Sequence, residues 1–160
     1  MTRKSDLDYL RMAIKVADKS KAGGNHPFGS VLVDDSGEVI GEGLNTTSVD
    51  GGPGHSEANL ARVAARNFAP DLLRKCTLYT SVEPCSMCSG TIYWANIGKV
   101  AYGMSEKRLA EMTGDNPENQ TQDLPCREVF KAGQWQVEVF GPFPEVENEV
   151  AAAHIGFWDR

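Results

Sequence analysis

The chain has 160 residues, a formal net charge of −6 and a sequence pI near 5.1. This length favours one compact domain over residues 1–160 and leaves little room for a second core. The acidic balance argues against a large nucleic-acid footprint, because phosphate backbones bind basic surfaces. No apolar stretch approaches the roughly 18 residues of a membrane span, and residues 1–10 lack the apolar run of a secretory signal. We therefore expect a cytoplasmic protein that needs neither a membrane nor a nucleic acid as partner.

Hydrophobic spacing predicts helices that alternate with strands along the chain. The predicted helices are 6–20, 56–68, 85–96, 126–132 and one from about 145 onward. The predicted strands are 28–34, 38–44, 76–82, 98–103 and 135–140. Asp35-Ser36-Gly37 makes the first two strands an antiparallel hairpin, and strands joined through helices can be parallel. This order indicates an α/β sandwich.

Several remaining features have simple structural interpretations. The stretch 113–123 (TGDNPENQTQD) holds no Lys, Arg or large apolar residue and is expected to form a surface loop or a lid. Cys76 and Cys126 are expected to be buried thiols. His26 is interpreted as a loop residue, and His154 as a partly exposed residue of the last helix.

The cysteine pair in Pro84-Cys85-Ser86-Met87-Cys88 is the first sign of a reactive site. Metal binding explains so close a pair better than a disulfide does in a chain that is not visibly secreted. Cys85 and Cys88 share one face of a helix start, and His55 begins another predicted helix. Zinc takes imidazole nitrogen and thiolate sulfur in tetrahedral geometry, and three protein ligands with one open position are typical of catalytic sites. We expect two helix N-termini to bring His55, Cys85 and Cys88 to one Zn²⁺ ion.

Glu57 follows His55 by two residues. A carboxylate beside a zinc-activated water can take a proton from it and return that proton to a leaving amine. The pattern H-x-E followed by P-C-x-x-C is the signature of zinc-dependent nucleobase deaminases. His55-Ser56-Glu57 and Pro84-Cys85-Ser86-Met87-Cys88 match it, which makes Glu57 the candidate catalytic residue.

With these motifs the chain resembles the cytidine deaminase-like superfamily, in the branch of guanine deaminase, fungal-type cytosine deaminase and bacterial tRNA adenosine deaminase. The resemblance covers roughly residues 7–103 and includes Pro27-Phe28-Gly29, Gly43-Leu44-Asn45 and Glu83. It implies a three-layer α/β/α sandwich with a central mixed five-stranded sheet, here one zinc-dependent deaminase domain. It also implies the zinc ligands and proton shuttle named above, and commonly a homodimer.

The resemblance further suggests which residues hold the substrate. Asn45 is expected to hydrogen-bond the bound base, although an Asn at a strand end also often caps a turn. Main-chain groups near Gly54 and Glu83 are expected to orient the ring. Trp158 and Asp159 resemble the aromatic and acidic tail that closes over the ring in fungal-type cytosine deaminases. The same tail could instead make a dimer contact or fray.

The expected reaction replaces an exocyclic amine by oxygen on a free nucleobase or close analogue, of guanine, cytosine or isocytosine type, and releases ammonia. The run Gly90–Ala95 resembles bacterial guanine deaminases, whereas the tail resembles cytosine deaminases. A nucleoside or a tRNA adenosine is the alternative substrate. The tRNA hypothesis is weaker because 105–109 lacks the Gly-Ala pair of those enzymes. A non-catalytic, zinc-stabilised interaction module is the alternative of a different class.

Overall fold

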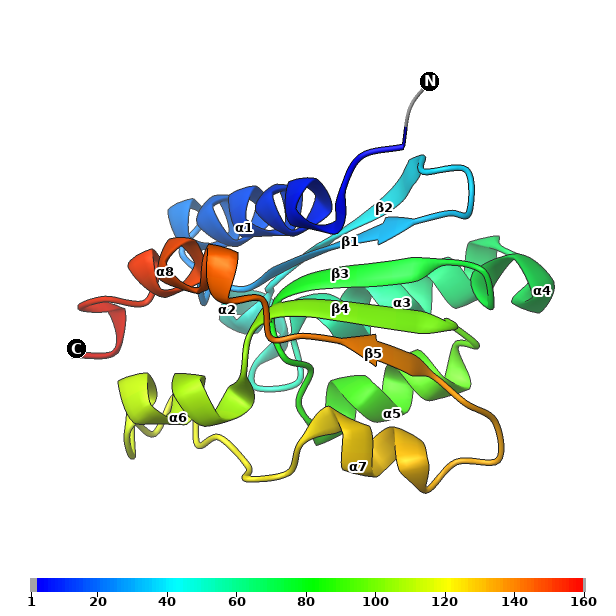
Figure 1. The fold of residues 1–160 in the computed structure, drawn as a ribbon. Helices are drawn as coiled ribbons and strands as arrows, with labels where there is room; N and C mark the ends of the chain where they lie inside the picture. The colour runs from blue at the N-terminus through cyan, green and yellow to red at the C-terminus, as the bar shows by residue number, and fades with distance from the viewer. Residues whose placement is uncertain (1–2, 160) are drawn as a thin grey trace.

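The computed structural model describes residues 3–159 and centres on a five-stranded sheet in the order β2-β1-β3-β4-β5 (Figure 1). The strands are β1 Gly29–Val33, β2 Val39–Leu44, β3 Thr77–Val82, β4 Lys99–Met104 and β5 Glu138–Phe140. β1 pairs antiparallel with β2 and with β3, whereas β3 with β4 and β4 with β5 are parallel. The sheet is therefore mixed, with the predicted antiparallel hairpin at its start.

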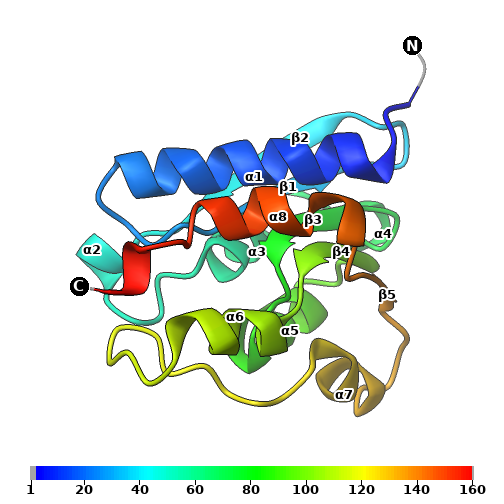
Figure 2. The same cartoon turned by 60° about the vertical axis from the view of Figure 1, so that its left-hand side comes forward.

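Helices cover both faces of this sheet, and the predicted α/β/α sandwich is confirmed. The helices are α1 Asp6–Ala22, α2 Thr47–Asp50, α3 Ser56–Asn67, α4 Pro70–Leu73, α5 Ser86–Trp94, α6 Glu106–Thr113, α7 Cys126–Lys131 and α8 Pro144–Ala152, with a 3-10 turn η1 at Phe157–Asp159. α1 and α8 lie side by side on one face, while α3, α5 and α7 lie on the other (Figure 2). None of the helices between residues 3 and 159 is both long and apolar enough to cross a bilayer.

Each face of the sheet has its own hydrophobic core, because successive strand residues point to opposite sides. In β3, Tyr79 packs with the α1 and α8 residues Leu10 and Val150. Its neighbour Leu78 packs on the opposite side with Leu60 of α3 and other residues. Burial on both faces explains why β3 shows a continuous apolar and small-residue run instead of alternation. The two cores fix α1 and α3 relative to the central strands.

Two local features differ from the sequence-based expectation. α6 was not predicted, although Ser105 caps it by accepting the N–H of Arg108 and Leu109 is buried beneath it. His154 lies just after α8 and not within the last helix, and it is 2% exposed and not partly exposed, because the chain that follows packs Trp158 against it. The indole N–H of Trp158 donates to its Nδ1 at 3.0 Å. Cys76 and Cys126 are buried, as predicted.

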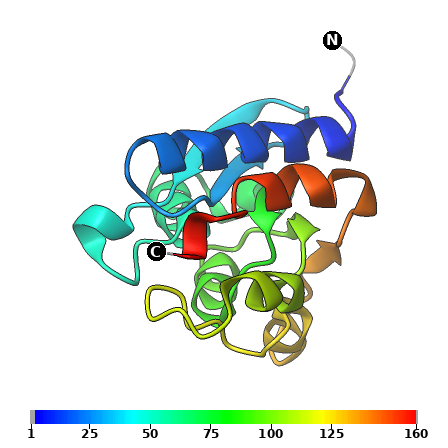
Figure 3. The same ribbon diagram turned by 90° about the vertical axis from the view of Figure 1, so that its left-hand side faces the viewer.

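The carboxyl ends of β3 and β4 lie at the same end of the sheet, because the two strands are parallel. The chain between β3 and α5 starts from this end, and Figure 3 views the molecule from the side where α6, the 114–125 segment and η1 gather. Open α/β sheets commonly bind ligands beyond the carboxyl ends of their strands. The fold therefore points to this end as the place of the site.

Candidate active site

Three metal-ligating side chains meet where α3 and α5 begin. His55 is the N-cap residue of α3 and Cys85 is the N-cap residue of α5. The Nδ1 atom of His55 lies 3.4 Å from Sγ of Cys85 and 3.5 Å from Sγ of Cys88. Zn–N and Zn–S bonds of about 2.0 and 2.3 Å at a tetrahedral angle would separate N and S by about 3.5 Å. The three residues therefore fit a tetrahedral zinc ion without rearrangement.

A hydrogen bond from the Cys88 thiol and contact with His55 lower the pKa of Cys85 to about 4. The same hydrogen bond and burial raise the pKa of Cys88, so Cys85 is the thiolate of the pair and a bound metal ion would favour loss of the Cys88 proton. Metal coordination requires thiolates, and helix N-termini favour them. Among residues 3–159 this is the one group of three or more His, Cys, Asp or Glu side chains placed closely enough to share a metal ion. It supplies three ligands and leaves a fourth position for a small molecule.

Glu57 lies in the first turn of α3, beside this ligand set, and is 5% exposed. Its Oε1 atom accepts hydrogen bonds from Oγ of Ser56 and from Oγ1 of Thr80, each at 2.8 Å. Burial raises the pKa of the Glu57 carboxyl. A carboxyl group whose pKa lies above its usual range is suited to take up and return a proton near neutral pH.

A cavity of about 420 Å³ opens beside these groups. Its lining combines the zinc-site end of α5, the start of α6 and the 118–122 segment, and includes Phe28, Gly52, Pro53, His55, Glu57, Val82, Glu83, Cys85, Met87, Glu106, Leu109, Glu118, Asn119, Gln120, Thr121 and Gln122. None of these described lining residues is Lys or Arg. The volume suits a small molecule, and the wall offers apolar surface with a few polar groups.

Asn45 directly follows β2, and its side chain caps the turn that comes after this strand. Its side chain is 1% exposed, and Oδ1 accepts the main-chain N–H groups of His26 at 3.2 Å and Thr47 at 3.1 Å. Oδ1 also accepts the Thr47 hydroxyl at 2.8 Å. The Nδ2 atom is buried and has no hydrogen-bond partner within the described part of the chain. An orphaned buried donor is unusual in a native structure and calls for a partner.

Gly54 and Glu83 have structural roles around the cavity. The carbonyl of Gly54 accepts the N–H of Thr46 at 2.8 Å, and a Cβ at Gly54 would lie 2.8 Å from the Thr46 main chain. Glu83 lines the cavity, and its Oε1 and Oε2 accept the main-chain N–H groups of Glu106 and Cys126 at 3.0 and 2.8 Å. One carboxylate therefore caps the first residues of α6 and α7, which the sequence analysis did not anticipate.

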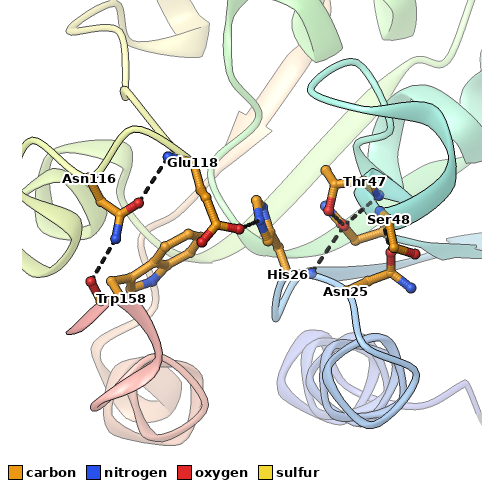
Figure 4. Close-up of polar contacts among 8 residues, drawn as sticks. Asn25, His26, Thr47, Ser48, Asn116, Glu118 and Trp158 are labelled. Carbon is orange, nitrogen blue, oxygen red and sulfur yellow. Dashed lines mark hydrogen bonds and ion pairs between the residues drawn. The ribbon is translucent and has the colours of Figure 1, made fainter. Parts of the chain in front are cut away.

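The C-terminal tail packs behind the cavity wall and does not line the cavity. Trp158 is buried and its ring centre lies 5.0 Å from that of His26, whereas Asp159 is exposed; neither is among the lining residues. Asn116 donates from Nδ2 to the Trp158 carbonyl at 2.6 Å and accepts the Glu118 N–H on Oδ1 (Figure 4). Glu118 Oε1 lies 3.2 Å from Nε2 of His26. The tail therefore reaches the cavity through the 114–125 segment.

The structure thus places His55, Glu57, Glu83 and Cys85 on the wall of one cavity, with the fully buried Cys88 beside His55 behind that wall. Asn45 and Gly54 are not among the lining residues. The sequence analysis missed the cavity residues of α6, Glu106 and Leu109, and the wall formed by 118–122. Their signal was weak: Ser105 is a helix cap followed by Leu109 at helical spacing, and 118–122 is entirely polar. The sequence suggested that 113–123 forms a surface loop or a lid, but it did not indicate which residues this segment contacts.

The comparisons with known proteins agree with this site. The family model for the cytidine and deoxycytidylate deaminase zinc-binding region matches residues 3–104. A probable cytosine deaminase of Schizosaccharomyces pombe is 37% identical over 154 residues, which span 96% of this chain and 93% of that protein. A tRNA-specific adenosine deaminase of Haemophilus influenzae is 40% identical over 102 residues, 63% of this chain and 59% of that one.

A solved structure with the same fold comes from guanine deaminase of Nitrosomonas europaea. It superposes with a TM-score of 0.74 at 16% identity, over 100% of this chain and 87% of that chain. At this identity the likeness is one of fold. The family match covers the ligand set and Glu57, and of these residues only the fully buried Cys88 does not line the cavity. The chain therefore belongs to the cytidine and deoxycytidylate deaminase family, with its zinc-binding region, and is a hydrolase that acts on C–N bonds.

Proposed function

We propose that the protein is a zinc-dependent hydrolytic deaminase of a free nucleobase or a close analogue. The observation that carries this proposal is a cavity lined by Glu57, a buried carboxyl group with a raised pKa, beside a ligand set of one imidazole and two thiols. His55, Cys85 and Cys88 would hold the ion. A fourth protein ligand, as a non-catalytic module would require, is not present in the cluster formed within residues 3–159.

In the proposed reaction the three ligand residues would hold the ion and Glu57 transfers the protons. Zinc, when bound, lowers the pKa of a water molecule at its open position. Glu57 takes a proton from that water and gives it to the ring nitrogen next to the attacked carbon. The remaining hydroxide bonds to this carbon. Glu57 then takes the second proton, from the new C–O–H group, and gives it to the exocyclic amine as the C=O bond forms. The C–N bond then breaks and ammonia leaves, which restores the starting charge of Glu57.

The ionisable groups of the cavity wall favour an unphosphorylated ring as the substrate. The cavity wall carries the carboxyl groups of Glu57, Glu83, Glu106 and Glu118, and none of its described residues is Lys or Arg, so no cationic side chain is available to bind a phosphate. The orphaned Nδ2 of Asn45 supports its role as a hydrogen-bond donor to the ring. The long match to the S. pombe protein favours a cytosine-type base, and the expected guanine and isocytosine types remain in the same class.

The alternative substrate is a nucleoside or a tRNA adenosine, which the match to the H. influenzae protein supports. That match covers only 59% of the relative, and the net charge of −6 disfavours an RNA backbone. We keep the free base as the first proposal. In this proposal Trp158 packs against His26 behind the cavity wall and does not touch the substrate ring.

We also propose that the protein works as a homodimer. Trp94 at the end of α5 is 81% exposed, and Met87 on the same helix is 39% exposed. Large exposed aromatic and sulfur-containing side chains are enriched at protein interfaces. Sedimentation equilibrium should give twice the chain mass of 17.4 kDa, and Trp94→Ala should shift the distribution toward monomer. A monomer at micromolar concentration would contradict this proposal.

The activity is tested by ammonia release from the zinc-loaded protein with cytosine, isocytosine, guanine and adenine, their nucleosides, and a tRNA anticodon stem. We expect release from one or more free bases, and none from zinc-loaded Glu57→Gln. Release from nucleosides or RNA alone would move the assignment to the alternative substrate. No release from any compound, with zinc bound, would contradict deamination.

A further inference from the structure

Glu106 is a buried carboxyl group for which the mechanism above has no use. It is the first residue of α6 and is 8% exposed, and together with Leu109 it presents one face of that helix to the cavity. Its main-chain N–H is held by Glu83, but no hydrogen-bond partner is found for its side chain among residues 3–159. Buried carboxyl groups are normally paired or hydrogen-bonded, and the oxygens of this one are not fully enclosed by protein, so a substrate in the cavity can pair with them.

The surroundings of Glu106 favour its uncharged form. Burial, together with the nearby acidic groups Cys85, Glu57 and Glu83, raises the pKa of its carboxyl to about 9. The N-terminus of α6 favours the charged form, but no Lys or Arg among the described residues lines the cavity to stabilise it. The charge of a bound Zn²⁺ ion would be balanced by the two thiolates that hold it. A buried carboxyl group without a cationic partner of its own takes up a proton. Glu106 can then donate through its O–H and accept through its C=O.

We propose that Glu106 is a specificity-determining residue that reads the edge of the substrate ring as a neutral carboxylic acid. Its O–H donates to a ring carbonyl, and its C=O accepts from the adjacent ring N–H. The preferred substrate therefore carries a lactam edge, an N–H next to a C=O. This inference rests on the proposed deaminase function and narrows its substrate class to uncharged lactam bases, such as guanine, cytosine and isocytosine.

Other parts of the molecule are less informative. A larger groove of about 870 Å³ runs along β5 and α7 between Arg127 and Phe140, and it contains none of the reactive residues. Nothing in the structure indicates what would fill it. Glu118 also lines the cavity, but half of its side chain is exposed and it already contacts His26.

Measurements of ligand binding to a catalytically inactive variant test the role of Glu106 independently of catalysis. We would measure dissociation constants by calorimetry on zinc-loaded Glu57→Gln protein, carrying Glu106, Glu106→Gln or Glu106→Met. The probes are matched pairs: guanine with 2-aminopurine, cytosine with 4-aminopyrimidine, and isocytosine with 2-aminopyrimidine. The second compound of each pair lacks the lactam carbonyl. Glu111→Gln, on the exposed side of α6, is the matched control, and zinc content and melting temperature report folding.

Glu106→Met should weaken binding of the lactam base by about 10-fold or more and leave its partner compound within about 2-fold. Glu106→Gln also offers one N–H donor and one C=O, so it should retain most of the affinity. Equal affinity of the Met variant for the lactam base would overturn the inference, as would equal losses in the Gln and Met variants. So would the absence of any lactam binding.

Ammonia release by the unaltered protein tests the proposed deamination separately from the recognition role of Glu106. Binding that depends on Glu106 without ammonia release would refute deamination and support the recognition role. Ammonia release with binding that is insensitive to Glu106 would support deamination and overturn the recognition role.

Discussion

The hydroxyl of Ser56 donates a 2.8 Å hydrogen bond to Oε1 of its sequence neighbour Glu57. Thr80 of β3 donates to the same oxygen at 2.8 Å, and Ser30 of β1 donates to the Ser56 hydroxyl at 3.3 Å. The two hydroxyl donors fix one oxygen of the carboxyl group and leave the other to exchange protons.

Ser56→Ala should lower kcat and leave zinc content unchanged. A hydrogen bond to a charged group contributes about 1.5 kcal/mol or more, which corresponds to about a 10-fold loss of kcat if it acts in the transition state. Steady-state kinetics on the best base of the ammonia panel measures this. Ser36→Ala, in the exposed β1–β2 turn, should leave kcat unchanged. An unaltered kcat in Ser56→Ala would show that Thr80 alone positions Glu57.

Removal of the metal should abolish turnover and lower the melting temperature. A ligand bound only by the folded state stabilises it, and three buried or half-buried ligand side chains lose their partner when zinc is removed. Chelation followed by zinc addition should restore both properties. Cys85→Ser should reduce zinc to well below one ion per chain, while Cys76→Ala, a buried thiol opposite Leu72, should retain it. Full zinc content in Cys85→Ser would contradict the ligand assignment.

Glu83→Gln should destabilise the fold without removing any ligand. Glu83 accepts N–H groups from the first residues of α6 and α7, and a Gln side chain has one accepting oxygen in place of two. Loss of one helix cap costs about 1–2 kcal/mol of unfolding free energy. Urea unfolding measures this, with exposed Glu111→Gln as control. Equal midpoints for the two variants would mean that the double cap contributes no stability.

Acid should destabilise the tail through His154. Burial, with the charges of Lys21 and His26, lowers the pKa of His154 from 6.5 to about 4. The unfolded chain therefore binds a proton between these values while the folded chain does not, so stability falls as pH decreases from 6.5 to 4. The loss on this group is about 3 kcal/mol. His154→Gln can still accept the Trp158 N–H, and it should lose less stability over this interval in urea unfolding.

A parallel pH dependence of the wild-type protein and His154→Gln would contradict this explanation. Proton competition for the zinc ligands acts on both proteins, so the difference between the two curves isolates His154. Trp158 fluorescence should report the same difference, because its indole N–H bonds to His154 Nδ1.

The sequence predicted the layers of the fold because its strongest signals are local. The apolar spacing in α1 and the hairpin turn at Asp35-Ser36-Gly37 determine elements that the structure contains. α6 was missed because its stability comes from Leu109 packing and from the cap by distant Glu83. The pattern within 106–113 alone does not reveal that cap. Tertiary contact also explains the burial of His154.

The candidate site, like the fold, was predicted from the sequence only where its signals are local. The ligand set and Glu57 lie within two short motifs, so their convergence followed from helix starts and zinc chemistry. Glu106 and the 118–122 wall come from segments that reach the cavity only after folding. Trp158 was expected near the ring, but it lies one layer further out, behind His26.

The central claim is that water oxygen replaces an exocyclic amine in the cavity beside Glu57. The most direct test is the mass of the product formed in oxygen-18 water by the zinc-loaded protein acting on the best base of the panel. The account predicts a product that carries one oxygen-18 atom, one ammonia released per product, and no labelled product from zinc-loaded Glu57→Gln. Product without the label, or equal labelling by Glu57→Gln, would contradict it.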